Sequence, residues 1–342
     1  MKKRLVVFGA LLMMFCFNFN NAEGQKSDYH LAKTIPLEGD GGWDYLSVDE
    51  LNHQLFVSHS TRVNVVDLLK GEQIGVITGT EGVHGIAIDN DLKRAFISCG
   101  KDSSVSVVGL LDYKLIAKVA VTGKNPDAIL YDPFSKKVFT FNGRTSNSTV
   151  LDAKTLKVVA TIPLSGKPEF AQTDEKGKIF VNIEDKSALT IIDAKNLTVE
   201  KTWSISPGEE PSGLALDRVN HRLFSVCSNK MMIVSDAVSG KVVTSVPIGN
   251  GCDGVAFDPG TKRIFASNGE GTMTVIQQKS ADQYEVTENF TTQSGARTIT
   301  TDPTTHHIYL SVGEYLPGTD RRRAVKPNSF KIIDIEPLKK AN

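Results

Sequence analysis

The side chains with the greatest chemical potential lie at seven equivalent positions, each five residues before a recurring aspartate. Four are carboxylates, one is a histidine and one is an arginine. In chain order they are Asp44, His84, Asp127, Glu169, Ser212, Asp253 and Arg297. Carboxylates that are brought together repel one another, and a divalent cation or a cationic ligand relieves that repulsion. We therefore expect a ligand-binding set, whose candidate metal ligands are Asp44, His84, Asp127, Glu169 and Asp253.

The recurring aspartates reveal how these positions are arranged. They are spaced 40 to 44 residues apart, at Asp49, Asp89, Asp132, Asp174, Asp217, Asp258 and Asp302. Behind each lies a strand centred on an aromatic residue, at Phe56, Phe96, Phe139, Phe180, Phe224, Phe265 and Tyr309. A period in the low forties with several strands per unit is typical of propeller blades and not of a helical solenoid. The sequence thus predicts an all-β, seven-bladed β-propeller of four-stranded antiparallel blades.

The recurring aspartates themselves have a structural explanation. In the third copy, strands are expected at about 128–131, 137–141, 148–152 and 158–163, and Asp132-Pro133 falls in the turn after the first of them. Asp at the first position and Pro at the second favour a type I turn, in which the carboxylate accepts hydrogen bonds from backbone N–H groups two residues on. We expect the seven aspartates to be turn caps.

The ends of the repeat array indicate how the ring closes. Residues 30–37 (HLAKTIPL) are similar to 158–164 (VVATIPL), which fit an outermost strand, yet they precede the first repeat. The final repeat supplies three strands and lacks a fourth, so we expect the N-terminal strand to complete the last blade and leave no open edge. One propeller domain over 28–336 results. Its only long insertion is 314–328, between the second and third strands of blade seven.

Residues 1–22 are predicted to be a secretory signal peptide. Lys2, Lys3 and Arg4 precede an apolar stretch over 5–17 that is too short to span a membrane. A lipid anchor at Cys16 is disfavoured, because the bulky Phe15 precedes it. We expect a periplasmic or secreted protein, monomeric and without a transmembrane segment. Cleavage leaves 36 basic against 39 acidic residues, which argues against a dedicated nucleic-acid protein.

The seven positions begin the innermost strands, so they are expected at the mouth of the central channel. His59 ends a second strand just outside them, and Trp43 is the best candidate for an exposed aromatic that stacks on a ligand. A structural alternative stays open, because polar residues at a propeller mouth also bind backbone N–H groups of neighbouring blades or hold channel water.

Two further features of the chain carry open alternatives. The only concentrated basic segment, 315–326, contains Arg321, Arg322, Arg323 and Lys326 and either folds over the mouth toward an anionic ligand or stays a solvated loop. Cys227 and Cys252 either pair in an oxidising compartment or remain buried, inert thiols. His306-His307, in a tight hairpin on the opposite face, is interpreted as surface decoration.

The repeat resembles that of the YVTN-family, or YncE-like, β-propellers. The similarity is carried by Pro126-Asp127-Ala-Ile-Leu-Tyr-Asp132-Pro133 with Lys137-Val-Phe-Thr-Phe-Asn142, by Pro211-Ser-Gly-Leu-Ala-Leu-Asp217 and by Lys262-Arg-Ile-Phe-Ala-Ser-Asn268. It extends over about residues 28–336. The resemblance implies a propeller fold and an exported location, and it implies no particular activity.

Three functions are compatible with the sequence. The first is a non-enzymatic exported binding module that uses the channel mouth for a small ligand, an envelope component or a protein partner. The second is a metal-assisted hydrolase of the lactonase or lyase kind, with a divalent cation and with His84 or His59 moving protons. The third, single-stranded nucleic-acid binding, rests on the arginine segment, on Trp43 and on a report for a family relative. No P-loop, GxSxG or HExxH occurs, and we assign no catalytic residue.

Overall fold

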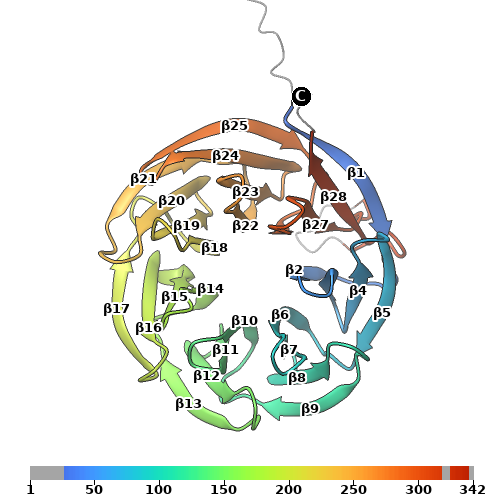
Figure 1. Cartoon of the computed structure of the whole chain (residues 1–342), viewed down its shortest axis with the longest axis vertical. Helices are drawn as coiled ribbons and strands as arrows, with labels where there is room; N and C mark the ends of the chain where they lie inside the picture. The colour runs from blue at the N-terminus through green and yellow to red at the C-terminus, as the bar shows by residue number, and fades with distance from the viewer. Residues whose placement is uncertain (1–26, 318–323, 339–342) are drawn as a thin grey trace, which may run out of the picture.

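The computed structural model describes residues 27–317 and 324–338, which form seven four-stranded antiparallel sheets arranged in a ring (Figure 1). The innermost strands surround the central axis and are β2 (Trp43–Asp49), β6 (Val83–Asp89), β10 (Pro126–Asp132), β14 (Pro168–Thr173), β18 (Pro211–Asp217), β22 (Cys252–Asp258) and β26 (Thr298–Thr301). The predicted fold class is confirmed.

The other strands of each blade lie progressively farther from the axis. The second strands are β3 (Gln54–His59), β7 (Arg94–Cys99), β11 (Lys137–Asn142), β15 (Lys178–Ile183), β19 (Arg222–Cys227), β23 (Arg263–Asn268) and β27 (Ile308–Val312). The third strands are β4 (Arg62–Asp67), β8 (Ser104–Gly109), β12 (Asn147–Asp152), β16 (Ala188–Asp193), β20 (Met231–Asp236), β24 (Thr272–Ser280) and β28 (Lys331–Pro337). The outermost strands are β5 (Glu72–Thr78), β9 (Leu115–Ala120), β13 (Val158–Pro163), β17 (Thr198–Ser204), β21 (Val242–Pro247), β25 (Gln283–Thr291) and β1 (Tyr29–Pro36).

Little other regular structure occurs in the described ranges. One turn of 3-10 helix, η1 (Glu184–Lys186), links β15 to β16. Within 27–317 and 324–338, no helix has the length and apolar character needed to cross a membrane.

The core lies between neighbouring blades. The aromatic residue of each second strand is buried, as Phe96 and Phe139 illustrate with no exposed surface. Phe96 packs in one cluster with Val138 and Leu151 of the next blade. Because each blade covers the flank of its neighbour, the apolar face of every sheet is removed from water only in the complete ring.

The recurring aspartates cap the turns between first and second strands, as expected. The Asp132 carboxylate accepts hydrogen bonds from the Ser135 N–H at 2.9 Å and the Thr173 hydroxyl at 2.6 Å. The Asp217 carboxylate accepts from the N–H groups of Val219 and Asn220, both at 3.0 Å. These carboxylates hold the turns on one face of the ring and therefore leave the innermost strands free to bear a site.

Strand β1 closes the ring. It pairs antiparallel with β28, with Tyr29 opposite Pro337 and Pro36 opposite Lys331. Blade seven therefore combines the N-terminal strand with the last three strands, as the sequence predicted, and β1 lies beside β28 in Figure 1.

The predicted insertion in blade seven is present between β27 and β28. Its described part is a short hairpin base, in which Tyr315 bridges Val325 and the Lys326 ammonium lies 2.7 Å from the Glu314 carboxylate. Arg321, Arg322 and Arg323 lie outside the described residues.

Candidate site at the channel mouth

The charged residues predicted at the channel mouth do come together. Asp44, His84, Asp127, Glu169, Ser212 and Asp253 are each the second residue of an innermost strand, and Arg297 directly precedes β26. Side chains at the same position of neighbouring strands lie at the same height along the axis, because the blades repeat one geometry. We call these seven residues the charged layer.

His84 is the centre of the charged layer. Its Nδ1 lies 2.7 Å from the Asp44 carboxylate and 3.6 Å from the Asp127 carboxylate, so one imidazole links the first three blades. One ligand atom from each of the three lies within 4.8 Å of the others. Such a set of one nitrogen and two carboxylate oxygens suits a divalent cation that accepts mixed ligands.

The remaining acidic members of the charged layer are paired with basic side chains. Asp253 forms an ion pair with the Arg297 guanidinium, which also donates to the Trp43 carbonyl at 2.9 Å and lies 4.0 Å from the Asp44 carboxylate. Glu169 lies 2.6 Å from the Lys167 ammonium. Of the five predicted metal ligands, Glu169 and Asp253 are therefore held apart from the His84 group.

Lys167 was not anticipated from the sequence. It lies two residues before Glu169 at the start of β14 and also forms an ion pair with Glu184 of η1. Its signal was a single basic residue beside the acidic member of one repeat, which is weak because lysine is common on exposed loops.

Burial and mutual repulsion shift the titration of the charged layer. Burial raises the pKa of Asp127, and the repulsion from Asp44 and Asp253 adds to it, so the pKa reaches about 6 despite the opposing attraction of His84. Burial and the charge of Asp127 also raise the pKa of Glu169 to about 8, against the lowering effect of Lys167. Protons thus already compensate part of the negative charge.

The histidine is shifted in the sense expected for an ion-paired imidazole. Burial lowers the pKa of His84, but the hydrogen bond to Asp44 and the charges of Asp127 and Asp44 outweigh burial and raise it to about 9. At neutral pH His84 is therefore an imidazolium that donates to Asp44. A metal ion would have to displace this proton before Nδ1 could become a ligand.

Two aromatic predictions for the site were wrong. Trp43 is not exposed: its side chain retains 5% of its surface and packs between Phe330 and Tyr315 at 5.8 and 5.6 Å between ring centroids. His59 is fully buried, with its ring 4.0 Å from that of Phe330, and burial lowers its pKa. Trp43 and His59 are paired across β2 and β3. Tyr315 of the insertion covers Trp43, and Phe330, directly before β28, packs against both.

The predictions for the cysteines and the paired histidines are also decided. Cys227 and Cys252 are unpaired, buried thiols, so the disulfide alternative was wrong. The interpretation of His306-His307 as surface decoration was wrong as well. His306 Nδ1 lies 2.8 Å from the turn-capping Asp258, and His307 Nδ1 lies 2.7 Å from Asp334 of β28.

Sequence reasoning missed the layer directly beneath the charged residues. The residue that directly follows each member of the charged layer is small in five blades and aromatic in the other two. The small residues are Gly85, Ala128, Gly213, Gly254 and Thr298. The aromatic residues are Tyr45 and Phe170, whose rings meet at 5.0 Å with an angle of 66° between their planes. An alignment of the seven copies at this position indicates the contact, because only two of the seven side chains are long enough to extend far from their strands.

Comparisons by sequence show a partial similarity. No protein-family model matches the chain. Over 103 residues it is 29% identical to the uncharacterized protein YncE of Salmonella typhi and 28% identical to that of Salmonella typhimurium. The match covers 30% of this chain and only 29% of the length of either relative.

Comparisons by structure show the same fold at low sequence identity. The chain matches a chain of the Kuenenia stuttgartiensis hydrazine synthase with a TM-score of 0.70, at 15% identity over 80% of this chain and 94% of that one. It matches a chain of the mitotic checkpoint complex at 0.74, with 11% identity over 99% and 100%, and U3-55K at 0.77, with 9% identity over 91% and 98%. Taken with the partial sequence match, the seven-bladed architecture supports the resemblance of this chain to YncE-like propellers.

Proposed function

We propose that this propeller is an exported, non-enzymatic binding module whose ligand presents a small cationic group to the charged layer. The fold is that of a binding or scaffold module in general. The observation that carries the proposal is the convergence of Asp44 and Asp127 on His84, beside two further carboxylates.

The charge balance of the layer favours a cation over an anion. Four carboxylates face one imidazole, one guanidinium and the ammonium of Lys167, and burial with mutual repulsion keeps protons on part of the carboxylates. A ligand cation replaces those protons without adding repulsion. Because the charged layer lies at a channel mouth, the group that enters is a small amine, guanidinium or metal ion, either free or carried by an envelope component or a protein partner.

Binding at the mouth is tested with small cations on the mature chain. Isothermal titration with Zn2+, Mn2+, Ca2+ and a diamine should give a signal for at least one of them, and Asp127→Asn should weaken it about tenfold or more, because a desolvated charged partner is lost. The matched control is Asp91→Asn, which changes an exposed carboxylate that pairs with Lys136. Unchanged binding by the Asp127 variant, or no heat with any cation, would remove the proposal.

A metal-assisted hydrolase is the second candidate, favoured by the Asp44–His84–Asp127 group. These three residues would hold the ion, and a bound divalent cation supplies a Lewis acid and a water of lowered pKa. In this candidate His59 has no role in moving protons, because it is buried beneath Phe330. Metal retained by the purified protein and lost in His84→Ala would support the hydrolase, whereas cation binding without hydrolysis of lactone or ester substrates leaves the binding module.

Single-stranded nucleic-acid binding rests on residues outside the described part of the chain. The basic groups of the charged layer are paired with carboxylates, and Trp43 is covered by Tyr315 and Phe330. Deletion of 318–323 removes the three arginines and keeps Val325 and Lys326, which form the hairpin base with Tyr315 and Glu314. Loss of oligonucleotide binding in the same variant, with a steep dependence on salt, would revive this function.

A further inference from the structure

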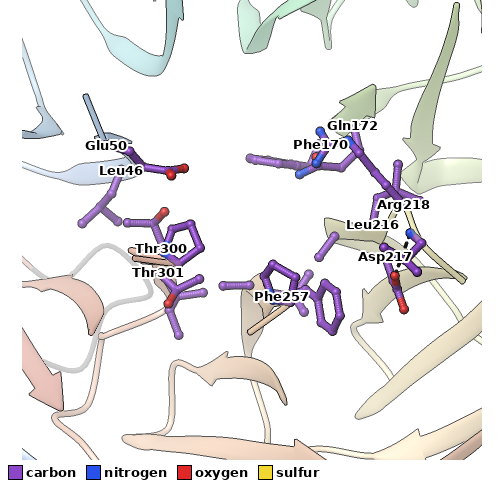
Figure 2. Close-up of a pocket in the computed structure, with 17 residues that line it drawn as sticks. Leu46, Glu50, Phe170, Gln172, Leu216, Asp217, Arg218, Phe257, Thr300 and Thr301 are labelled. Atoms are coloured by element: carbon purple, nitrogen blue, oxygen red, sulfur yellow. Dashed lines mark hydrogen bonds between the residues drawn. The ribbon is translucent and has the colours of Figure 1, made fainter. Parts of the chain in front are cut away.

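A cavity lies in the channel at the end remote from the charged layer. It has a volume of about 420 Å³ and is lined by the later residues of β2, β14, β18, β22 and β26 and by the turns that follow them (Figure 2). A volume of this size is typical of small-molecule sites, which span roughly 300 to 1,000 Å³.

The cavity and the charged layer are separated by aromatic side chains. Tyr45 of blade one and Phe170 of blade four make contact, and Phe170 also lines the cavity. Asp44 and Glu169 directly precede these two aromatics in their strands, so they lie on the other side of the contact. The cavity and the charged layer therefore lie on opposite sides of the contact between Tyr45 and Phe170.

The cavity walls have an apolar part and a polar part. Leu46, Phe170, Leu216, Phe257 and Ile299 supply hydrocarbon and aromatic surface from five different strands. Burial of a ligand's apolar surface against such walls contributes about 25 cal/mol per Å². The walls therefore favour a ligand with an alkyl or aryl body.

One carboxylate that lines the cavity has neither an ion-pair partner nor a hydrogen-bond partner among residues 27–317 and 324–338. It belongs to Glu50, at the end of β2, and it points into the cavity toward the side of Phe170 (Figure 2). The two other charged residues that line the cavity are occupied. Arg218 donates to the Thr173 carbonyl at 3.0 Å and lies 3.1 Å from Glu175, and the Asp217 carboxylate accepts from the Val219 N–H at 3.0 Å and from the Gln278 amide at 2.8 Å. The cavity thus offers a negative charge and no free positive one.

Two further carboxylates near Glu50 add to the negative charge at this side of the cavity. Burial, together with the charges of Asp302 and Asp49, raises the pKa of Glu50. Those two aspartates are committed to their turns, since Asp49 accepts from the Asn52 N–H and Asp302 from the Thr304 N–H. A cation beside Glu50 would relieve repulsion that the turn caps themselves cannot relieve.

We propose that this cavity binds an amphiphilic organic ammonium, with the cationic head at Glu50 and the apolar body against Phe170 and Phe257. A single carboxylate suits a monovalent ammonium better than a divalent metal ion, which requires several oxygen ligands. This site is independent of the function proposed for the charged layer.

The test compares three ligands of equal chain length by isothermal titration on the mature protein. Octyltrimethylammonium should bind about tenfold more tightly than octanol or octanoate, because it alone places a positive charge beside Glu50. Glu50→Gln should abolish this preference. Glu50→Lys should invert it toward octanoate, and the exposed position of Glu50 allows both variants to fold.

Two control variants separate this site from others. Asp127→Asn in the charged layer should leave octyltrimethylammonium binding unchanged, so the two proposals fail independently. Asp91→Lys reverses an exposed charge on another turn and should also have no effect. Equal binding of the three ligands, an unchanged preference in Glu50→Lys, or no binding at all would overturn the proposal.

Discussion

The rings of Tyr45 and Phe170 meet with centroids 5.0 Å apart although they belong to blades one and four. Neighbouring blades contact along their whole flanks, whereas blades this far apart approach only near the axis. This contact lies between the charged layer and the cavity that Phe170 lines. It also connects blade one directly to blade four, which are otherwise connected only through the blades between them.

The aromatic contact should stabilise the fold. Phe170→Ala is expected to lower the free energy of unfolding by about 2 kcal/mol, less than for a fully buried phenylalanine because Phe170 is half-buried. Urea denaturation monitored by circular dichroism measures the loss. Tyr45→Phe keeps the ring and should change stability by less than about 0.5 kcal/mol. An equal loss in both variants would show that the ring contact is not the cause.

Stability should fall as pH rises from about 4 to 9. The pKa values of Asp127 and Glu169 are raised in the folded chain to about 6 and 8, so the folded state keeps protons that the unfolded chain has lost. The raised pKa of His84, about 9, acts in the same direction, because its contribution is complete below 6.5 and disappears as pH passes 9. Thermal melts across this range should show a steady decline.

Replacement of Glu169 measures how much of the loss of stability with rising pH is due to that residue. Glu169→Gln cannot ionise and should reduce the loss of stability between pH 5 and 8 by about 1 to 3 kcal/mol. Glu270→Gln, at an exposed carboxylate after β23, is the matched control and should leave the profile unchanged. A profile for the Glu169 variant that overlays the parent would contradict the role of burial at this position.

The turn-capping aspartates should matter in proportion to their burial. Asp132→Ala removes two hydrogen bonds from a carboxylate with no exposed surface and should cost about 2 kcal/mol. Asp152→Ala removes a cap at an outer turn, where the N–H of Thr155 donates at 2.7 Å, and should cost about 1 kcal/mol. Denaturant midpoints of the two variants should therefore differ, with Asp132→Ala the lower.

The cysteines should be unreactive in the native protein. Burial raises the pKa of Cys227 to about 12 and that of Cys252 well above its ordinary value, and the thiolate is the reactive form. Ellman's reagent should label Cys99, Cys227 and Cys252 only after denaturant is added. A reductant should leave the melting temperature unchanged; a drop on reduction would indicate a disulfide.

The repeat made the architecture predictable because it records the same backbone geometry seven times. The caps at Asp132 and Asp217 follow from local turn chemistry, which involves residues only two or three positions apart. The convergence of His84 with Asp44 and Asp127 also followed, because equivalent positions of neighbouring blades must lie side by side around an axis. Regular repetition thus specifies both the ring and the composition of its charged layer.

The features that the sequence did not predict arise from departures from the repeat. Trp43 occupies the start of an innermost strand, where exposure was expected, but Tyr315 from the blade-seven insertion covers it. The contact between Tyr45 and Phe170 depends on two long side chains that meet across the axis, and no local pattern encodes that distance. The cavity was not predicted either, because its walls are assembled from five different blades and include Phe170 of this contact.

The pairing of β1 with β28 determines where the ring is mechanically weakest. Tyr29 lies opposite Pro337, so both ends of the propeller leave blade seven at the same edge of one strand pair. A force that pulled these ends apart would break the backbone hydrogen bonds of this pair one after another, whereas the other blades would carry no load until the pair had separated. A molecule held at both ends would therefore open at blade seven first and release its remaining blades in sequence.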